Sequence, residues 1–236
     1  MFILRNLIHT LAIIAAALAT LSCTQTAPPS GFLEKSSQMT QSSTAPYQLS
    51  WKKQGLDFRN YRQIEIAPIS TEHTRIRGIA MADWRKPSNK LQFSEISANA
   101  KSLKEAYIKA FKTVSPDRWS IGSSGHALKL ELHLAEIAPS RPLLETAGFF
   151  VTGGGLLNQP SIAIEGRFRD PVTDEVIATF ADRRKGEIAL LDLSKLKSYQ
   201  MHRKVMAQWA RQTVLWISLA KGQKVPRPNK LKLITW

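Results

Sequence analysis

The side chains that could hold a metal ion or carry out catalysis are few in this sequence. Only one cysteine is present, Cys23, so no zinc site with several sulfur ligands can form. No two histidines lie three or four residues apart; they are His9, His73, His126, His133 and His202. The sequence therefore predicts no metal site, and it shows no set of acid, base and nucleophile from which to assign an enzyme reaction.

Two glycine-rich segments are candidates for catalytic or phosphate-binding loops. Residues 122–125 (GSSG) contain serines but lack the strand, sharp turn and helix that position a nucleophilic serine. Residues 153–155 (GGG) are not followed by the Gly-Lys-Ser/Thr of a phosphate-binding loop. We therefore expect a protein that is not an enzyme and that needs no soluble cofactor.

Basic side chains gather on two predicted strands and form the candidate anion site. Arg167 and Arg169 share the polar side of one strand, and Arg183, Arg184 and Lys185 end the next. Guanidinium groups suit carboxylate or phosphate, so this strand pair could contact an anion. Ion pairs within the chain explain these residues equally well, with the acidic partners Glu165, Asp170, Asp174 and Asp182. No aromatic residue is interleaved with the basic residues on the polar side, since Phe168 belongs to the apolar side of its strand, so nucleic acid is not favoured as a partner.

An uncharged segment, residues 147–157 (AGFFVTGGGLL), joins two predicted strands and is the candidate partner contact. Apolar surface in a connection has to be buried against something. Either the segment packs on its own domain as the end of a long hairpin, or it forms a self-association or partner interface. The contact candidates are Phe149, Phe150, Gly153, Gly154, Gly155 and Leu156.

The N-terminus has the pattern of an export signal. One positive charge, Arg5, precedes an apolar run over residues 7–21, which is too short to be a comfortable membrane span. The tetrapeptide Thr20-Leu21-Ser22-Cys23 resembles the lipobox of bacterial lipoproteins, although a leucine is usual where Thr20 stands. The prediction is a signal peptide over residues 1–22 and lipidation of Cys23. The alternative is an ordinary signal peptide followed by an unmodified cysteine.

Lipidation would place a diacylglycerol and a fatty acyl chain such as palmitate on Cys23. Each buried methylene contributes about 0.8 kcal/mol, so two or three chains anchor a protein durably. Thr24 stands where an Asp would signal retention in the inner membrane, so we expect the periplasmic face of the outer membrane. The expected partners are this membrane and an envelope protein or a second copy of the chain.

The chain is strongly basic, with 33 Lys and Arg against 18 Asp and Glu and a net charge of +15. Such a field attracts the protein to anionic surfaces. The alternative function is therefore binding of anionic envelope material, namely lipopolysaccharide, phospholipid or polysaccharide, through the arginine-rich strand pair.

Periodicity predicts the elements that must position these residues. Alternating apolar residues predict strands over residues 62–69, 127–137, 161–169 and 175–182, and three- and four-residue spacing predicts helices from Ser94 or Ser97 to Val114 and over residues 196–219. This order predicts an α+β fold, a two-layer α/β sandwich with a mostly antiparallel sheet and two helices on one face. The expected divisions are a lipidated flexible tether over residues 23–46, one domain over residues 47–222 and a basic tail over residues 223–236.

Four short motifs in this order resemble a family of bacterial lipoproteins, the domain of unknown function 3313. They are residues 30–33 (SGFL), residues 61–68 (YRQIEIAP), Glu165-Gly166 before Asp170-Pro171, and residues 182–184 (DRR). The resemblance covers residues 30–218 and departs at Thr173-Asp174, where Thr-Gly is expected.

The resemblance implies no settled activity. The order of elements is similar to that of the curli secretion lipoprotein, the Pel polysaccharide export lipoprotein, lipoprotein activators of penicillin-binding proteins and the N-terminal domain of the Tol translocation protein. All of these act by docking or assembling, so we expect a non-enzymatic outer-membrane lipoprotein that docks or assembles with envelope partners. That expectation is an analogy of fold, and fold does not determine function.

Overall fold

The computed structural model describes residues 30–42, 44–76, 89–138, 161–185, 198–219 and Val225. The predicted signal peptide, Cys23, the uncharged segment 147–157 and the basic tail apart from Val225 lie outside the described residues. Within the described ranges, none of the helices has the length and apolar character needed to cross a membrane.

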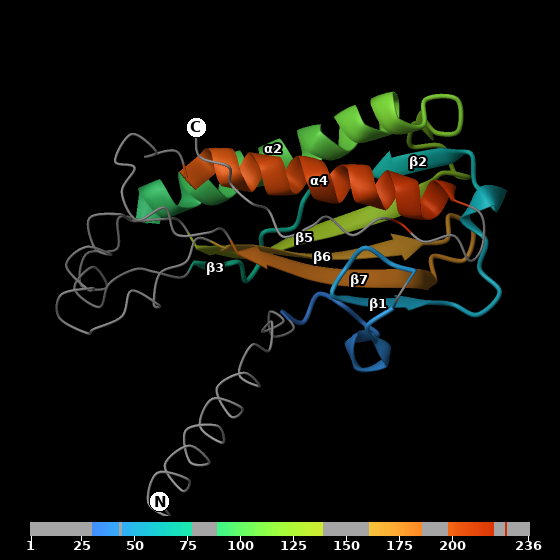
Figure 1. Ribbon diagram of the computed structural model, residues 1–236, viewed down its shortest axis with the longest axis horizontal. Helices are drawn as coiled ribbons and strands as arrows, with labels where there is room; N and C mark the ends of the chain where they lie inside the picture. Colours follow the sequence, from blue (N-terminus) through green and yellow to red (C-terminus); the bar gives the residue numbers. More distant parts are fainter. Residues whose placement is uncertain are drawn as a thin grey trace, which may run out of the picture.

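The core of the fold is one seven-stranded sheet with two helices on one of its faces (Figure 1). The strand order is β1-β7-β6-β5-β2-β4, and β3 also pairs with β5. The antiparallel pairs β5–β6, β6–β7 and β1–β7 are the longest, and the parallel pairs are short. The strands are β1 (Leu49–Lys52), β2 (Gln63–Ile66), β3 (Arg75–Ile76), β4 (Ser120–Ile121), β5 (Leu128–Ala138), β6 (Ser161–Arg169) and β7 (Val176–Lys185). The predicted fold class is confirmed.

Two long α-helices, α2 (Asn89–Val114) and α4 (Ser198–Ser218), cover the sheet, and short 3-10 turns lie at η1 (Ser36–Gln38) and η2 (Phe58–Asn60). The helices run in the same direction. Tyr107 of α2 hydrogen-bonds to Thr213 of α4 at 2.9 Å, and Trp119, just after α2, donates to Ser218 near the end of α4 at 2.8 Å. Each helix faces the sheet with the apolar stripe that its sequence period predicts.

The alternation of buried and partly exposed residues along the long strands shows which face of the sheet contributes to the hydrophobic core. Leu128, Leu130, Leu132 and Leu134 are at most 1% exposed and lie toward the helices. The register then shifts between Leu134 and Glu136, which is a β-bulge. The simple alternation of buried and partly exposed residues already ends before this bulge, because β5 is buried throughout from Leu132 to Ala138.

The predicted flexible tether is wrong for residues 30–42 and 44–46. Leu33 and Ala45 are 6% and 2% exposed, and Thr40 exchanges two backbone hydrogen bonds with Ser50 of β1. The average composition of this segment is polar, but folding depends on a few residues that find specific partners rather than on the average. The packed domain therefore includes residues well before the expected boundary at residue 47.

The Phe180 ring packs closely against the backbone of the neighbouring strand because residue 166 is a glycine. Gly166 of β6 lies opposite Phe180 of β7, and a Cβ at residue 166 would lie 2.2 Å from the Phe180 ring. The ring is fully buried and stacks on Tyr47 with centroids 4.2 Å apart. The Phe180 ring therefore occupies the space that a side chain at residue 166 would need.

We expect Gly166→Ala to lower the free energy of unfolding by about 1–3 kcal/mol, because the added methyl group overpacks the core. Urea unfolding measures this change. Gly125→Ala is the matched control, since nothing lies within 4 Å of a Cβ at residue 125. If both variants unfold at the same urea concentration, the proposed steric conflict is absent.

Candidate functional site

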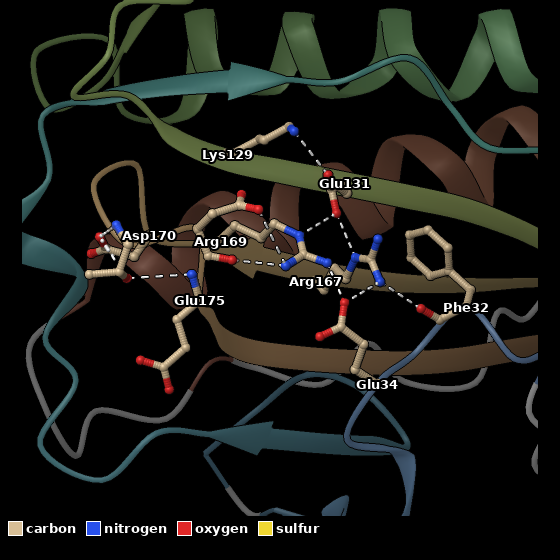
Figure 2. Close-up of polar contacts among 10 residues, drawn as sticks. Phe32, Glu34, Lys129, Glu131, Arg167, Arg169, Asp170 and Glu175 are labelled. Carbon is tan, nitrogen blue, oxygen red and sulfur yellow. Dashed lines mark hydrogen bonds and ion pairs between the residues drawn. The ribbon is translucent and has the colours of Figure 1, made fainter.

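The predicted arginines of β6 lie on the face of the sheet that is opposite the helices. Arg167 and Arg169 are two residues apart, so both point to this second face, and Arg167 lies directly opposite Glu131 of β5. The Nε atoms of Arg167 and Arg169 donate to the same Glu131 oxygen at 2.5 and 3.0 Å (Figure 2). Lys129 approaches the other Glu131 oxygen at 3.1 Å.

Glu34 completes this group from the N-terminal segment. Its carboxylate accepts from Arg167 at 3.0 Å and also pairs with Arg169 (Figure 2). We call Glu34, Glu131, Arg167 and Arg169 the arginine cluster. The side chains of both arginines are at most 17% exposed, so two guanidinium groups are held by two carboxylates near the protein surface.

Residues 30–34, which we call the N-terminal strap, lie across this second face. Ser30 donates from its backbone N to Glu165 at 2.9 Å, and its hydroxyl also binds the Glu165 carboxylate. The Phe32 ring stacks on His133 with centroids 5.3 Å apart, and the Arg167 guanidinium lies 4.4 Å from the Phe32 ring centroid. The alternation along β5 predicts that His133 faces solvent. The strap covers this side chain, which is fully buried.

The electrostatics of the cluster favour fixed charges. Burial raises the pKa of Glu131, but hydrogen bonds from Arg167, Arg169 and Lys129 outweigh it and bring this pKa down to about 2. Burial lowers the pKa of His133, which favours its neutral form. A carboxyl that stays ionised throughout the physiological range is a poor proton donor and a weak base. The arrangement is therefore suited to structural pairing and not to proton transfer.

Arg183 is on the same face but apart from the cluster. Its Nη2 lies 2.6 Å from Glu136, both side chains are at most 5% exposed, and Ser161 donates to the same Glu136 oxygen at 2.9 Å. Arg183 pairs in register with Ala163, four strand positions from Arg167, which is roughly 13 Å along the sheet.

Arg184 lies on the opposite face, between the sheet and α4. It donates to Asp182 at 2.8 Å and to Gln208 and Gln212 at 2.6 Å each, and Trp209 donates to Asp182 at 2.6 Å. These bonds join β7 to α4. The side chain of Lys185 lies outside the described part. The predicted anion-contact residues therefore occur in three separate places, and the structure does not bring them together.

The model of a protein family described as "Protein of unknown function (DUF3313)" matches residues 28–213, well over half of the chain. The chain belongs to this family. The resemblance inferred from the four short motifs is thus confirmed, and the family description assigns no activity.

Other comparisons of the DUF3313 chain gave distant similarities. A search of curated proteins found no match. The PelC dodecamer from Paraburkholderia phytofirmans is 10% identical, with 69% of this chain and 96% of that chain covered and a TM-score of 0.38. A Xanthomonas campestris protein of family DUF330 is 12% identical, with 66% and 83% covered and a TM-score of 0.39. A minor lipoprotein from Acinetobacter baumannii is 12% identical, with 67% and 94% covered and a TM-score of 0.33.

Sequence reasoning identified the arginines of the DUF3313 chain but not their main partners. Of the predicted acidic partners, Asp182 binds Arg184 and Asp174 lies 4.0 Å from Arg169. The partners Glu34, Glu131 and Glu136 were not predicted. Glu34 directly follows the SGFL motif, so the one apolar patch in a polar segment was the available signal for the strap. Among the described residues, no group of three or more His, Cys, Asp or Glu is placed to hold a metal ion.

We expect Glu131→Gln to lower the free energy of unfolding by roughly 2 kcal/mol or more, because it leaves two half-buried guanidinium groups without their shared carboxylate. Glu34→Gln should cost less, since the Glu34 side chain is 49% exposed and solvent screens its pairs. Urea unfolding compares the variants. The control is Glu175→Gln, which removes an exposed ion pair with Lys53 and should leave the midpoint unchanged. Equal midpoints for Glu131→Gln and the control would contradict this account of the cluster.

Proposed function

We propose that this DUF3313 protein is a lipid-anchored lipoprotein of the outer membrane that docks an envelope partner and catalyses no reaction. The observation that carries the proposal is the strap. Its first residue, Ser30, is fastened to Glu165 only seven residues after Cys23. Seven residues span at most about 25 Å when fully extended, so acyl chains on Cys23 would hold the domain close to the bilayer.

The chemistry of the second face supports docking more than catalysis. Arg167 and Arg169 donate hydrogen bonds to Glu131, Arg183 forms an ion pair with Glu136, and Glu131 stays ionised with a pKa of about 2. The same contacts make the predicted arginine-rich strand pair a poor anion site. An external anion would have to displace Glu34 and Glu131 from Arg167 and Arg169.

Lipidation is tested at Cys23. Mass spectrometry of the mature protein should show an N-terminal cysteine that carries a diacylglycerol and an acyl chain, and density separation of membranes should place it in the outer membrane. Cys23→Ala should lose the lipid and remain an uncleaved precursor. A mature N-terminus at another residue, or a free thiol at Cys23, would contradict the proposal.

Partner docking is tested in the uncharged segment. Phe149→Ser with Phe150→Ser should reduce crosslinking in cells to a partner or to a second copy, because it removes apolar contact area, while far-UV circular dichroism stays unchanged. Val172→Ser is a control, since Val172 is an apolar residue that is 77% exposed elsewhere on the domain. Crosslinking that survives the double substitution would rule out the segment as the contact.

A further inference from the structure

The outer surface of the helix layer is strongly basic. α2 contains five lysines and two glutamates, and α4 contains two arginines, one lysine and no acidic residue. The exposed cations, which we call the helical basic surface, are Lys101, Lys109, Lys112, Arg203, Lys204 and Arg211. They lie on the sides of the helices that face away from the sheet, because the opposite sides, with Leu103, Tyr107 and Trp209, are fully buried.

These cations differ from those of the sheet in their lack of partners. Arg167, Arg169, Arg183 and Arg184 each bind a carboxylate of the same chain. Among the described residues, no acidic group lies within 4.0 Å of any member of the helical basic surface. In the part of the chain that the structure describes, most of the positive charge that remains available to an external anion thus lies on the helices.

The geometry of this surface suits an extended polyanion. Lys101 and Lys112 are separated by about 16 Å along the axis of α2, at roughly 1.5 Å per residue. α4 runs alongside in the same direction, as the Tyr107–Thr213 and Trp119–Ser218 hydrogen bonds show. Two packed helices lie about 8–10 Å apart, so the charges form two neighbouring rows and not one pocket.

The surface lacks the features that other partners require. Ile121 and Val172 are the only large hydrophobic residues exposed in the described ranges, and both are outside the helices. A protein partner usually needs a buried aromatic or aliphatic centre, and single-stranded nucleic acid needs aromatic rings on which its bases stack. A chain of sugars with regularly spaced carboxylates needs only the charge.

The position of the strap argues against the anchoring membrane as the occupant, and this step rests on the lipidation proposed above. Ser30 lies on the second face, whereas α2 and α4 lie on the first (Figure 1). To reach the helical basic surface from Ser30, a chain must pass across β7 and β1 to the edge of the sheet, a distance of about 10 Å. It must then cross the thickness of the sheet and the helices, a further distance of about 20 Å. A link of about 25 Å cannot lay the helical basic surface on the same bilayer.

We infer that the helical basic surface binds an acidic polysaccharide through its carboxylate groups, on the side of the domain that faces away from the lipid anchor. Binding is electrostatic and spread over both helices. It therefore weakens steeply as salt is added.

The test measures binding of the mature protein, purified in non-ionic detergent, to immobilised alginate oligomers at about 50 mM and about 500 mM salt. The wild type should bind at low salt and lose at least about tenfold in affinity at high salt. The triple variant Lys101→Gln, Lys109→Gln, Arg211→Gln should bind at least about tenfold more weakly at low salt. The matched triple Lys52→Gln, Lys53→Gln, Arg62→Gln removes the same number of exposed charges elsewhere and should stay within about twofold of the wild type.

Circular dichroism and the thermal midpoint establish that both triple variants are folded, and glutamine keeps the helix propensity of the replaced residues. The inference is overturned if alginate does not bind, or if both triples lose affinity equally, since net charge alone would then explain binding. It is also overturned if phosphatidylglycerol micelles or single-stranded DNA compete better than soluble alginate. Acylation of Cys23 is measured separately, so a failure of the anchor and a failure of alginate binding are distinguishable.

Discussion

The shared carboxylate of Glu131 is the interaction on which the second face of this protein depends. Among the described residues, helices cover one side of the sheet, and the charged side chains of the arginine cluster on the other side pair with one another. Glu131 receives Arg167, Arg169 and Lys129, and the Glu34 carboxylate closes the group from outside. Since Glu34 belongs to the strap, the same pairing that balances charge also fixes where the N-terminal segment lies. That position determines where the domain stands relative to anything attached at Cys23.

The two faces consequently have different electrostatic roles. On the second face, the arginines form ion pairs with carboxylates of the same chain. Arg183 and Glu136 are buried together, and each charge is tolerated there because the other neutralises it. On the helices, Lys109 and Arg211 are solvated and unpaired among the described residues. The described part of the chain therefore does not present its unpaired positive charge evenly. Most of this described, unpaired charge lies on the helix layer, on the opposite side of the sheet from the strap.

The sequence predicted the elements whose stability comes from a repeating pattern, namely the two helices and the long strands, with β6 matched to the residue. It missed β1, β3 and β4, which are two to four residues long and exist because a neighbouring strand supplies their hydrogen bonds. The arginines predicted to contact an anion do bind carboxylates, but they do not form one group. Arg183 and Arg184 are consecutive residues of a strand, so alternation alone places them on opposite faces. Their carboxylate partners depend on register and on the strap, neither of which a local pattern contains.

The register itself depends on the turn between β6 and β7, where this chain departs from the expected Thr-Gly pair. Asp174 adopts a φ of +53°, a left-handed conformation that favours glycine but that Asp tolerates. The Asp170 carboxylate holds the turn by accepting the backbone N–H groups of Val172 and Thr173 at 2.9 and 3.0 Å, and the Tyr61 hydroxyl donates to it at 2.6 Å. A slip of one residue in this hairpin would exchange the faces of every side chain in β7. Arg183 would then lose Glu136, and Arg184 would leave α4. The turn therefore determines which guanidinium groups each face receives.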